Sequence, residues 1–590
     1  MKSFAICRMN ALLRSQLFGA AGALVWSVSD MLVAGNIVGV DALAGIAATV
    51  PVFLGAQFLA KLVYCGAGYL FARRQGKFDV AGARQAAGLA LEAGVVVGVV
   101  TYLAMFFGRD IYFDFMGLTG GVREQAVAYW TWMSVVAALN PFTMAMWRLV
   151  YADGEMVTTA IGDLCAPFLV VGLSIAFTKM TGSAAGSALG TLVGGFIADS
   201  IMMLHLLRQS NAVRPKWCFS LRGLRELVTY SLTDSSTRLC QSGFMAVLNK
   251  MIVFAASTAY LPVAGMVMLV LELREMLDKV GDAYMPIAEM YLGEGNLQRL
   301  RELARYGTVV AVVSGFVVFA LVWSFAPQIV SLYGIPAGAV YETSVHALKV
   351  SALTIPISSM LCFLSSHYLT INRVALSVVE TVLEEFVLTA GCVVALGLLY
   401  GLDAIWFGLP IGGALTLVLI GAYGWRRNGC FLPMFIPADR SAILNLTFVP
   451  VAERIVEIRD AAERFLLGQG VLRETVSKIM LLVEECAMTV ADDNGGRRVV
   501  LSEVSLSVSA DETCVILRDT GRLRDITDGD ARVSSLRSFV VSGLMRSYED
   551  RRYLMTIGCN RAAFAFRRQS HRQSEPRTDY KSLILRTGRP

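Results

Sequence analysis

Long apolar runs separated by short polar stretches fill the chain from about residue 17 to residue 425. A transmembrane helix needs about 20 consecutive, mostly apolar residues, and twelve such runs can be placed. They lie near 17–38, 44–71, 86–107, 125–149, 157–178, 185–207, 226–254, 258–290, 306–328, 343–370, 376–399 and 403–425. We therefore expect an all-α polytopic membrane protein of about twelve transmembrane helices, followed by a smaller domain of another kind.

The twelve runs divide into two sets of six that look like copies of one another. The differences 293 − 76, 334 − 117 and 368 − 151 all equal 217, and the paired landmarks are Gly76 with Gly293, Gly117 with Gly334, and Tyr151 with Tyr368. Repeats with an even number of spans keep one orientation, which predicts two six-helix bundles with a site at their interface. We place the bundles at 17–215 and 216–430, after a cytosolic N-terminus at 1–16.

Basic residues gather in alternate loops, and this sets the expected orientation. Cytoplasmic loops of membrane proteins carry an excess of Lys and Arg. The basic loops here join spans two and three, six and seven, and eight and nine, and they include Arg73, Arg208 and Arg299. We therefore place these loops and both termini in the cytosol. We also expect the protein to lie in the plasma membrane of a bacterium.

The composition agrees with lipid as the solvent for most of the chain. Of the 590 residues 55% are hydrophobic and 17% are charged, whereas soluble proteins are about a quarter charged. The net charge of +6 reflects topology, so no nucleic-acid partner is expected. The eleven cysteines contain no C-x-x-C pair and the four histidines lie far apart, which argues against a disulfide framework and against a metal site.

The pattern changes near residue 440, where short alternating segments replace the long apolar runs. ILNLTFVP reads as a strand, 452–468 and 473–491 as amphipathic helices, and VVLSEVSLSV with TCVILRD as a strand pair. A helix at 534–548 and a strand pair formed by YLMTIG and AAFAF complete a cytosolic α/β domain, 440–567. The final 568–590 is polar and basic, and we expect it to be disordered.

Carboxylates inside apolar runs are the candidates for function, because an acid in hydrocarbon is costly unless it faces a cavity or a partner. Asp30, in VWSVSDMLVAG, is the first candidate. It is neutral when protonated and charged when a cation is near, so it can carry a proton. Alternatively Ser27, Ser29 or Asn36 satisfies it, and its role is packing.

A second case is the pair Asp163 and Glu380, because 380 − 163 is again 217. Glu384 follows Glu380 by one helical turn, so the two face the same way and can share a proton or cation. The alternative places these acids at a cytosolic helix end, where negative charge favours a helix N-terminus.

The eighth span carries an acidic stripe over about a third of its circumference. Its members are Glu272, Glu275, Asp282 and Glu289, with Lys279 among them. A stripe of this kind cannot face lipid, and we expect Glu272 and Glu275 to line a cation-attracting cavity, with Glu275 paired to Lys279. Alternatively, the cytosolic half of a long helix extends into water.

Two further acids lie in the spans. Asp234 stands one turn before Arg238, and we expect a structural ion pair. Asp199 follows the apolar GGFIA near a helix end. We keep Asp199, together with Asn36, as a candidate for the ion and substrate cavity.

The segment VSDMLVAGNIVGVDALAG, 28–45, resembles the first-span signature of the multidrug and toxic compound extrusion (MATE) family. The matching residues are Asp30, Gly35, Gly39 and Ala42-Leu43-Ala44. The basic loop with Gly76 and Ala83, and MTGSAAGSALGTLVGG at 180–195, are similar to later family motifs. The resemblance covers roughly 10–427 and implies two six-helix bundles that expel amphipathic, often cationic compounds in exchange for sodium ions or protons. The acidic eighth span departs from the family pattern.

The C-terminal domain resembles the GHKL ATPase fold, a two-layer α/β sandwich, and in particular the anti-sigma-factor kinases. LLVEECAMTV, 481–490, is similar to the helix that carries the catalytic Glu and the magnesium-binding Asn, which implies a role for Glu485 and for the position of Thr489. RDTGR, 518–522, resembles the box whose carboxylate receives the adenine amino group, which implies a nucleotide-binding role for Asp519 and Gly521. Gly543 resembles part of the later glycine-rich box. Thr489 replaces the family's Asn, which argues against binding of ATP with Mg²⁺ and, more strongly, against kinase activity.

These features together predict a secondary active antiporter that exports multiple drugs or organic cations, coupled to entry of sodium ions or protons. We expect no enzyme activity and no cofactor in the membrane domain; its partners are an organic cation, membrane lipids and a cytosolic regulatory protein. Two other functions stay open: a flippase for a lipid-linked precursor, which should carry cationic residues in its cavity, and a ligand sensor that signals through the kinase-like domain.

Overall fold

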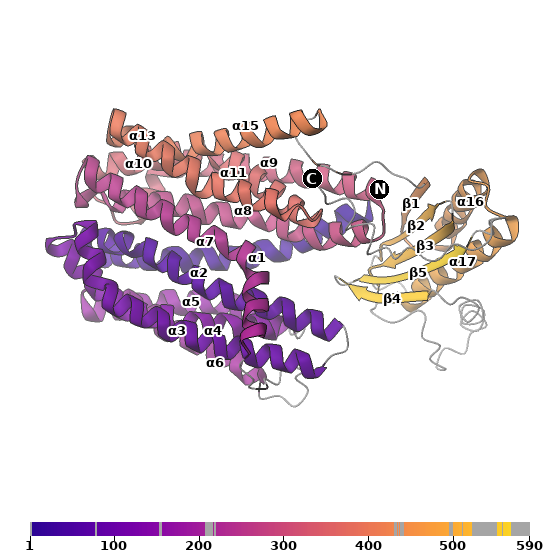
Figure 1. Ribbon diagram of the computed structural model, residues 1–590, viewed down its shortest axis with the longest axis horizontal. Coiled ribbons are helices and arrows are strands. Elements are labelled where there is room, and N and C mark those ends of the chain that lie inside the picture. Colours follow the sequence, from indigo (N-terminus) through magenta and orange to yellow (C-terminus); the bar gives the residue numbers. More distant parts are fainter. Residues whose placement is uncertain are drawn as a thin grey trace. The chain divides into compact units, whose positions relative to one another are not determined.

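The computed structural model describes residues 3–76, 80–152, 156–206, 216, 220–429, 434, 436, 442–494, 500–509, 511–521, 551–556 and 559–567 (Figure 1). The chain folds into two compact units. We call Met9–Glu289 with Arg301–Ile436 the membrane unit, and Met1–Arg8, Met290–Leu300 and Pro437–Pro590 the sheet unit. The predicted helix at 534–548 and the tail at 568–590 lie outside the described residues.

The membrane unit is built from long helices that run side by side (Figure 1). Its first half contains α1 (Phe4–Ile37), α2 (Val40–Gly76), α3 (Val80–Met116), α4 (Gly120–Ala152), α5 (Met156–Thr181) and α6 (Ala184–Leu206). Its second half contains α7 (Leu221–Ala255), η1 (Thr258–Tyr260), α8 (Pro262–Gly293), α9 (Leu297–Leu332), α10 (Ala339–Ala352), α11 (Ile355–Thr370), α12 (Val374–Val382), η2 (Leu383–Val387), α13 (Leu388–Tyr400), α14 (Leu402–Ile405) and α15 (Gly408–Asn428).

A helix or a run of two or three consecutive helices lies at each of the twelve positions that the sequence predicts. Within the described residues, eight helical segments are long and apolar enough to cross a membrane, and the pair α10 and α11, bent by 42°, makes a ninth. α7 and α8 are not among them because they carry several charges, and the apolar part of α5 that is described, Cys165–Thr181, is short. The structure thus supports a multi-pass membrane protein with eight or nine apolar spans, and the count of twelve crossings stays a prediction.

Equal offsets relate the two halves. α1 begins at Phe4 and α7 at Leu221, and α3 begins at Val80 and α9 at Leu297; 221 − 4 and 297 − 80 both give 217. The turns after α3 and α9 contain Gly117 and Gly334, whose φ angles of 75° and 73° lie in the left-handed region that favours glycine. These features agree with a duplicated sequence, while the division into two bundles at residue 215 remains a prediction.

The sheet unit contains a five-stranded antiparallel sheet with strand order β1-β2-β3-β5-β4. Its elements are β1 (Ala442–Phe448), α16 (Ala452–Gly468), α17 (Arg473–Asn494), β2 (Ser502–Val508), β3 (Glu512–Asp519), β4 (Arg551–Thr556) and β5 (Cys559–Arg567). α16 and α17 pack on one face, where Val504, Leu506 and Val515 join the apolar side chains of both helices in one core. The strands and the two helices lie where the sequence pattern predicts them.

Candidate functional site

Asp30 is buried between three helices of the first half, with 8% of its surface exposed. Tyr129 of α4 donates its hydroxyl to Oδ2 of Asp30 at 2.8 Å, and Thr191 of α6 donates to Oδ1 at 2.8 Å. Ser27 and Ser29, the local partners that the sequence suggested, donate instead to carbonyl oxygens of their own helix. Asp30 therefore connects α1 to α4 and α6 through both of its oxygens.

Asn36 lies at the end of the same helix and has a different role. Its side-chain amide donates to the carbonyl oxygen of Leu32 at 2.8 Å and to that of Leu332, at the end of α9, at 2.5 Å. The residue is exposed. Asn36 thus joins two helix ends, and it makes no hydrogen bond to Asp30 in the described chain.

Glu272 and Glu275 of α8 point toward α7, where Arg238 lies between them. The guanidinium of Arg238 is 3.8 Å from Glu272 Oε1 and 2.5 Å from Glu275 Oε2. The side chains of Arg238 and Glu272 are each 12% exposed, and that of Glu275 is 29% exposed. Lys61 of α2 is near enough to both carboxylates to interact electrostatically, so this group lies where the first half meets the second.

The expected pairing of Glu275 with Lys279 is wrong. Lys279 bonds to Asp282 at 2.6 Å, because the i, i+3 partner on α8 is closer, while Glu275 bonds to Arg238. Glu289 is exposed, as expected for a helix end that extends into water. The side chain of Asp234, the predicted partner of Arg238, lies outside the described residues.

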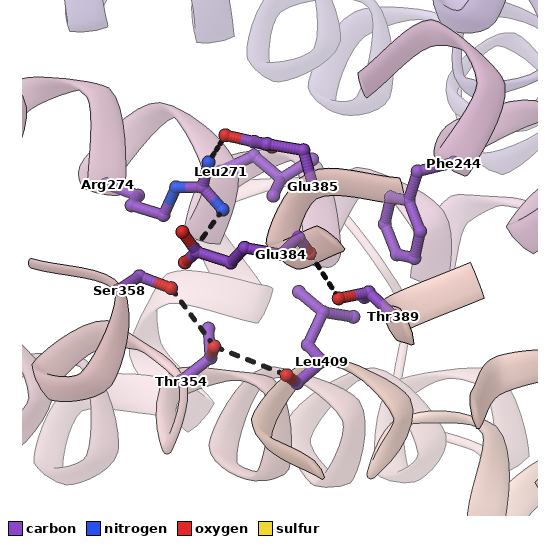
Figure 2. A pocket seen from close by; sticks show the side chains of 9 residues that line it. All are labelled: Phe244, Leu271, Arg274, Thr354, Ser358, Glu384, Glu385, Thr389 and Leu409. Carbon is purple, nitrogen blue, oxygen red and sulfur yellow. Dashed lines mark hydrogen bonds and ion pairs between the residues drawn. The ribbon is translucent and has the colours of Figure 1, made fainter. Parts of the chain in front are cut away.

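A second arginine, Arg274 of α8, is buried against two acids of the π-helix η2. Its side chain is 6% exposed and forms ion pairs with Glu384, at 3.5 Å, and with Glu385. Figure 2 shows the guanidinium between these two carboxylates. Neighbouring residues of an α-helix point about 100° apart. Here Glu384 and Glu385, which are neighbours, both pair with Arg274, and they lie in a wider π-turn. Such turns are often found at functional sites.

A small cavity adjoins this pair (Figure 2). Its lining residues are Phe244, Leu271, Arg274, Thr354, Ser358, Glu384, Glu385, Thr389 and Leu409. The space open to the centre of a water molecule is about 10 Å³, which suits about one water molecule. The cavity matches a water molecule or a small ion in size and is too small for a drug.

Glu380 lies one turn before Glu384, as the spacing predicted, and it is fully buried. Neither of its carboxylate oxygens meets a hydrogen-bond donor in standard geometry within the described part of the chain. The side chain of Asp163, its predicted counterpart, lies outside the described residues. Asp199 is half-buried and accepts a hydrogen bond from Trp147 Nε1 at 2.7 Å.

Sequence reasoning missed Arg274 and Glu385. A signal was present, because an arginine and two consecutive glutamates inside apolar spans require partners. Their pairing joins residues more than a hundred positions apart, and the π-turn that accompanies it leaves no regular periodicity.

In the sheet unit, Asp519 is buried and already bonded. Its Oδ1 accepts hydrogen bonds from the backbone N–H of Gly521 at 2.8 Å and from Asn560 Nδ2 at 2.9 Å. Thr489 donates its hydroxyl to the carbonyl oxygen of Glu485, one turn earlier on α17, at 2.8 Å. Gly543 lies outside the described residues. Among the described residues, no three His, Cys, Asp or Glu side chains gather as a metal site would require.

The model of the MatE family matches residues 18–176 and 239–390, which is more than half of the chain. The protein belongs to the MATE family. The matched ranges contain Asp30, Glu272, Glu275, Arg274 and the π-helix acids.

Individual MATE relatives are distant in sequence but similar in fold. A multidrug export protein, MepA, of Staphylococcus saprophyticus is 20% identical over 198 residues, which is 33% of this chain and 44% of that protein's length. A structure described as the inward-facing conformation of a multidrug resistance MATE transporter matches with a TM-score of 0.63 at 21% identity, over 72% of this chain and 98% of the other. A structure of the MATE multidrug transporter DinF-BH gives 0.61 at 18% identity, over 72% and 96%. These matches show a MATE transporter fold.

Proposed function

We propose that this chain is a secondary active exporter of organic cations, coupled to the entry of protons or sodium ions. The observation that best supports this function is the burial of Asp30 in a MATE fold, between hydroxyl groups from α4 and α6. An intramembrane carboxylate with neutral donors can be stable both with and without a bound cation, because the donors solvate the charged form.

Coupling between ion entry and export follows from the partners of Asp30 with and without a bound proton or sodium ion. The charged carboxylate accepts hydrogen bonds from Tyr129 and Thr191, and so holds α4 and α6 against α1. Binding of a proton or sodium ion at Asp30 removes or redirects these bonds. A ligand that changes the relative stability of two arrangements shifts their populations, which is the requirement for alternating access between two bundles.

The remaining acids attract the cationic substrate or take part in coupling. We assign this role to Glu272, Glu275, Glu380 and Glu384, with Asp163, Asp199 and Asn36 as further candidates. The flippase function is less favoured, because Arg238 and Arg274 are each paired with two carboxylates. Neither arginine is left to meet a phosphate.

Transport by proteoliposomes that contain the full chain tests this function. We expect a fluorescent organic cation to move when a proton or sodium gradient is imposed, and Asp30→Asn to reduce the gradient-driven rate by about tenfold or more, the scale of a typical coupling free energy. Asp114→Asn is the matched control, because Asp114 is 66% exposed and pairs with Arg123 outside any buried cluster. If neither gradient moves a cation in the wild type, the sensor function gains over the exporter.

We also propose that the C-terminal domain is a GHKL-like regulatory domain that faces the cytosol, as do both termini, in a bacterial plasma membrane. It answers a cytosolic protein or a ligand. Catalysis is not expected of it, because Thr489 offers a hydroxyl already bonded to Glu485 where the resemblance implies a magnesium ligand.

Labelled ATP titrated against the full-length protein tests the nucleotide assignment. Since Oδ1 of Asp519 is already occupied by Gly521 and Asn560, we expect weak binding that Mg²⁺ does not strengthen. Any binding that occurs should be lost in Asp519→Ala. Tight, magnesium-dependent binding of ATP that survives Asp519→Ala would contradict two assignments: Asp519 as the contact to adenine, and Thr489 as a residue that does not hold magnesium.

A further inference from the structure

The face of the sheet opposite α16 and α17 contains buried charges. Glu503 of β2 and Arg518 of β3 are cross-strand partners, and their side chains are both 0% exposed. Arg518 Nη1 is 2.9 Å from Glu503 Oε2 and donates to Ser505 Oγ at 3.0 Å. Charged residues on an open sheet face are normally hydrated, so full burial means that another segment covers this face.

The covering segment is the connection between α8 and α9, Met290–Leu300, which belongs to the same compact unit as the sheet. Glu294 pairs with Arg518 and, at 2.7 Å, with Arg561 of β5. Arg299 pairs with Glu503 at 2.9 Å.

Polar and aromatic contacts accompany these ion pairs. Tyr291 donates its hydroxyl to Glu503 Oε2 at 2.6 Å, and its ring lies 4.7 Å from the guanidinium carbon of Arg518. Asn296 donates its amide to Asn445 Oδ1 of β1 at 2.7 Å.

On this face of the sheet, Glu503 and Arg518 thus each meet an opposite charge on the connection. A buried ion pair is retained only with complete partners, because removal of one member leaves an uncompensated charge. Tyr291 to Arg299 contact β1, β2, β3 and β5, so the connection is held along its whole length.

The same connection is continuous with the helix that carries the candidate site. α8 contains Glu272, Arg274 and Glu275, and its last turn contains Tyr291. Seventeen residues separate Arg274 from Tyr291, which is about 26 Å of helix at 1.5 Å per residue. The chain therefore runs from these charged residues to the Met290–Leu300 connection within one helix, which contains Pro286.

From these contacts we propose that the sheet face is a docking surface for the α8–α9 connection, and that docking slows transport by holding α8 and α9 in one arrangement. The proposal rests on the exporter function above. Alternating access requires these helices to change their tilt, and a clamp that fits one arrangement makes that arrangement more stable than the other. Release of the connection then accelerates the cycle.

Substitutions on each side of the docking surface test the proposal in the full-length protein. Glu294→Gln and Arg518→Met should each raise the rate of gradient-driven cation transport by about fivefold. The double variant should be no faster than either single one, because both substitutions break the same ion pair between the connection and the sheet. Hydrogen exchange of Met290–Leu300 should accelerate by about tenfold, and the change should extend into α8 and α9. Arg454→Met is the matched control, since Arg454 forms an exposed pair with Glu457 on α16, and its rate should stay within about twofold of the wild type.

The outcomes separate this proposal from the exporter function. If hydrogen exchange of the connection becomes faster while the transport rate stays the same or falls, docking does not slow transport and that part of the proposal is overturned. Unchanged exchange in both variants overturns the docking surface. If Arg518→Met unfolds the sheet unit, Glu294→Gln still tests the proposal, because Glu294 lies outside the strands. If the wild type transports nothing, the exporter function fails, and exchange in α8 and α9 still decides whether the docked connection and those helices are coupled.

Discussion

Two arginines, the half-buried Arg238 and the buried Arg274, pair with acids of the second half. Arg238 lies between Glu272 and Glu275, and Arg274 pairs with Glu384 and Glu385. Each of these two groups therefore contains one more carboxylate than arginine. In a low-dielectric interior the pairing offsets much of the desolvation cost. Lys61 lies near both carboxylates of the Arg238 group, whereas the remaining negative charge of the Arg274 group favours a proton or a cation.

Removal of Arg274 tests how strongly its group depends on compensation. In Arg274→Met, Glu384 and Glu385 stay buried without their cation, so we expect a loss of about 3–5 kcal/mol in unfolding free energy. Thermal unfolding in detergent, followed by tryptophan fluorescence, measures it as a lower midpoint. Adding Glu384→Gln and Glu385→Gln to Arg274→Met should restore much of the midpoint, because no unpaired charge remains.

The matched control for this experiment is Arg109→Met. Arg109 forms a partly exposed pair with Asp110 at the end of α3, and the loss of a surface pair changes stability by less than about 1 kcal/mol. Equal midpoints for Arg109→Met and Arg274→Met would show that the buried pairs do not stabilise the fold.

At the scale of the elements, the end of α1 packs closely on the turn after α9. A Cβ atom at Gly35 would overlap the backbone carbonyl oxygen of Tyr333, and one at Gly334 would meet the backbone of Gly35. The amide of Asn36 bonds to Leu332 O at the same place. The two helix ends thus approach one another through glycine, and the contact joins the first half of the membrane unit to the second.

Gly35→Ala should destabilise this contact by about 1–3 kcal/mol, the usual cost of overpacking. The change should lower the midpoint of thermal unfolding. Gly19→Ala is the control in the same helix: no atom lies within 4 Å of the added Cβ, and alanine is the better helix former by about 1 kcal/mol. A midpoint for Gly35→Ala equal to or above that of Gly19→Ala would mean that the helix ends separate freely.

For the whole molecule, the positions of the helices and strands could be read from the sequence, whereas their polar contacts could not. Hydrophobic runs and the 217-residue offset predicted where α1 to α15 lie. A hydrophobic run is a local pattern and the offset is a repeat, so both can be read directly along the chain. Asp30 was found because a lone acid in an apolar run is conspicuous. The partners of Arg238 and the contact of Glu294 with Arg518, which are 224 positions apart, depend on tertiary packing, and no periodicity records them.

The sheet unit contains three separate segments of the chain, and this constrains how many times the chain crosses the bilayer. Phe4 donates its backbone N–H to Thr447, and Met290–Leu300 lies on the same sheet, so all three segments must share one side of the membrane. An even number of passages must then separate residue 8 from residue 290. Within the described residues, five apolar helices occupy that stretch, and five is odd. One of α5, α7 and α8, or all three, must therefore also traverse the lipid in spite of its shortness or its charges.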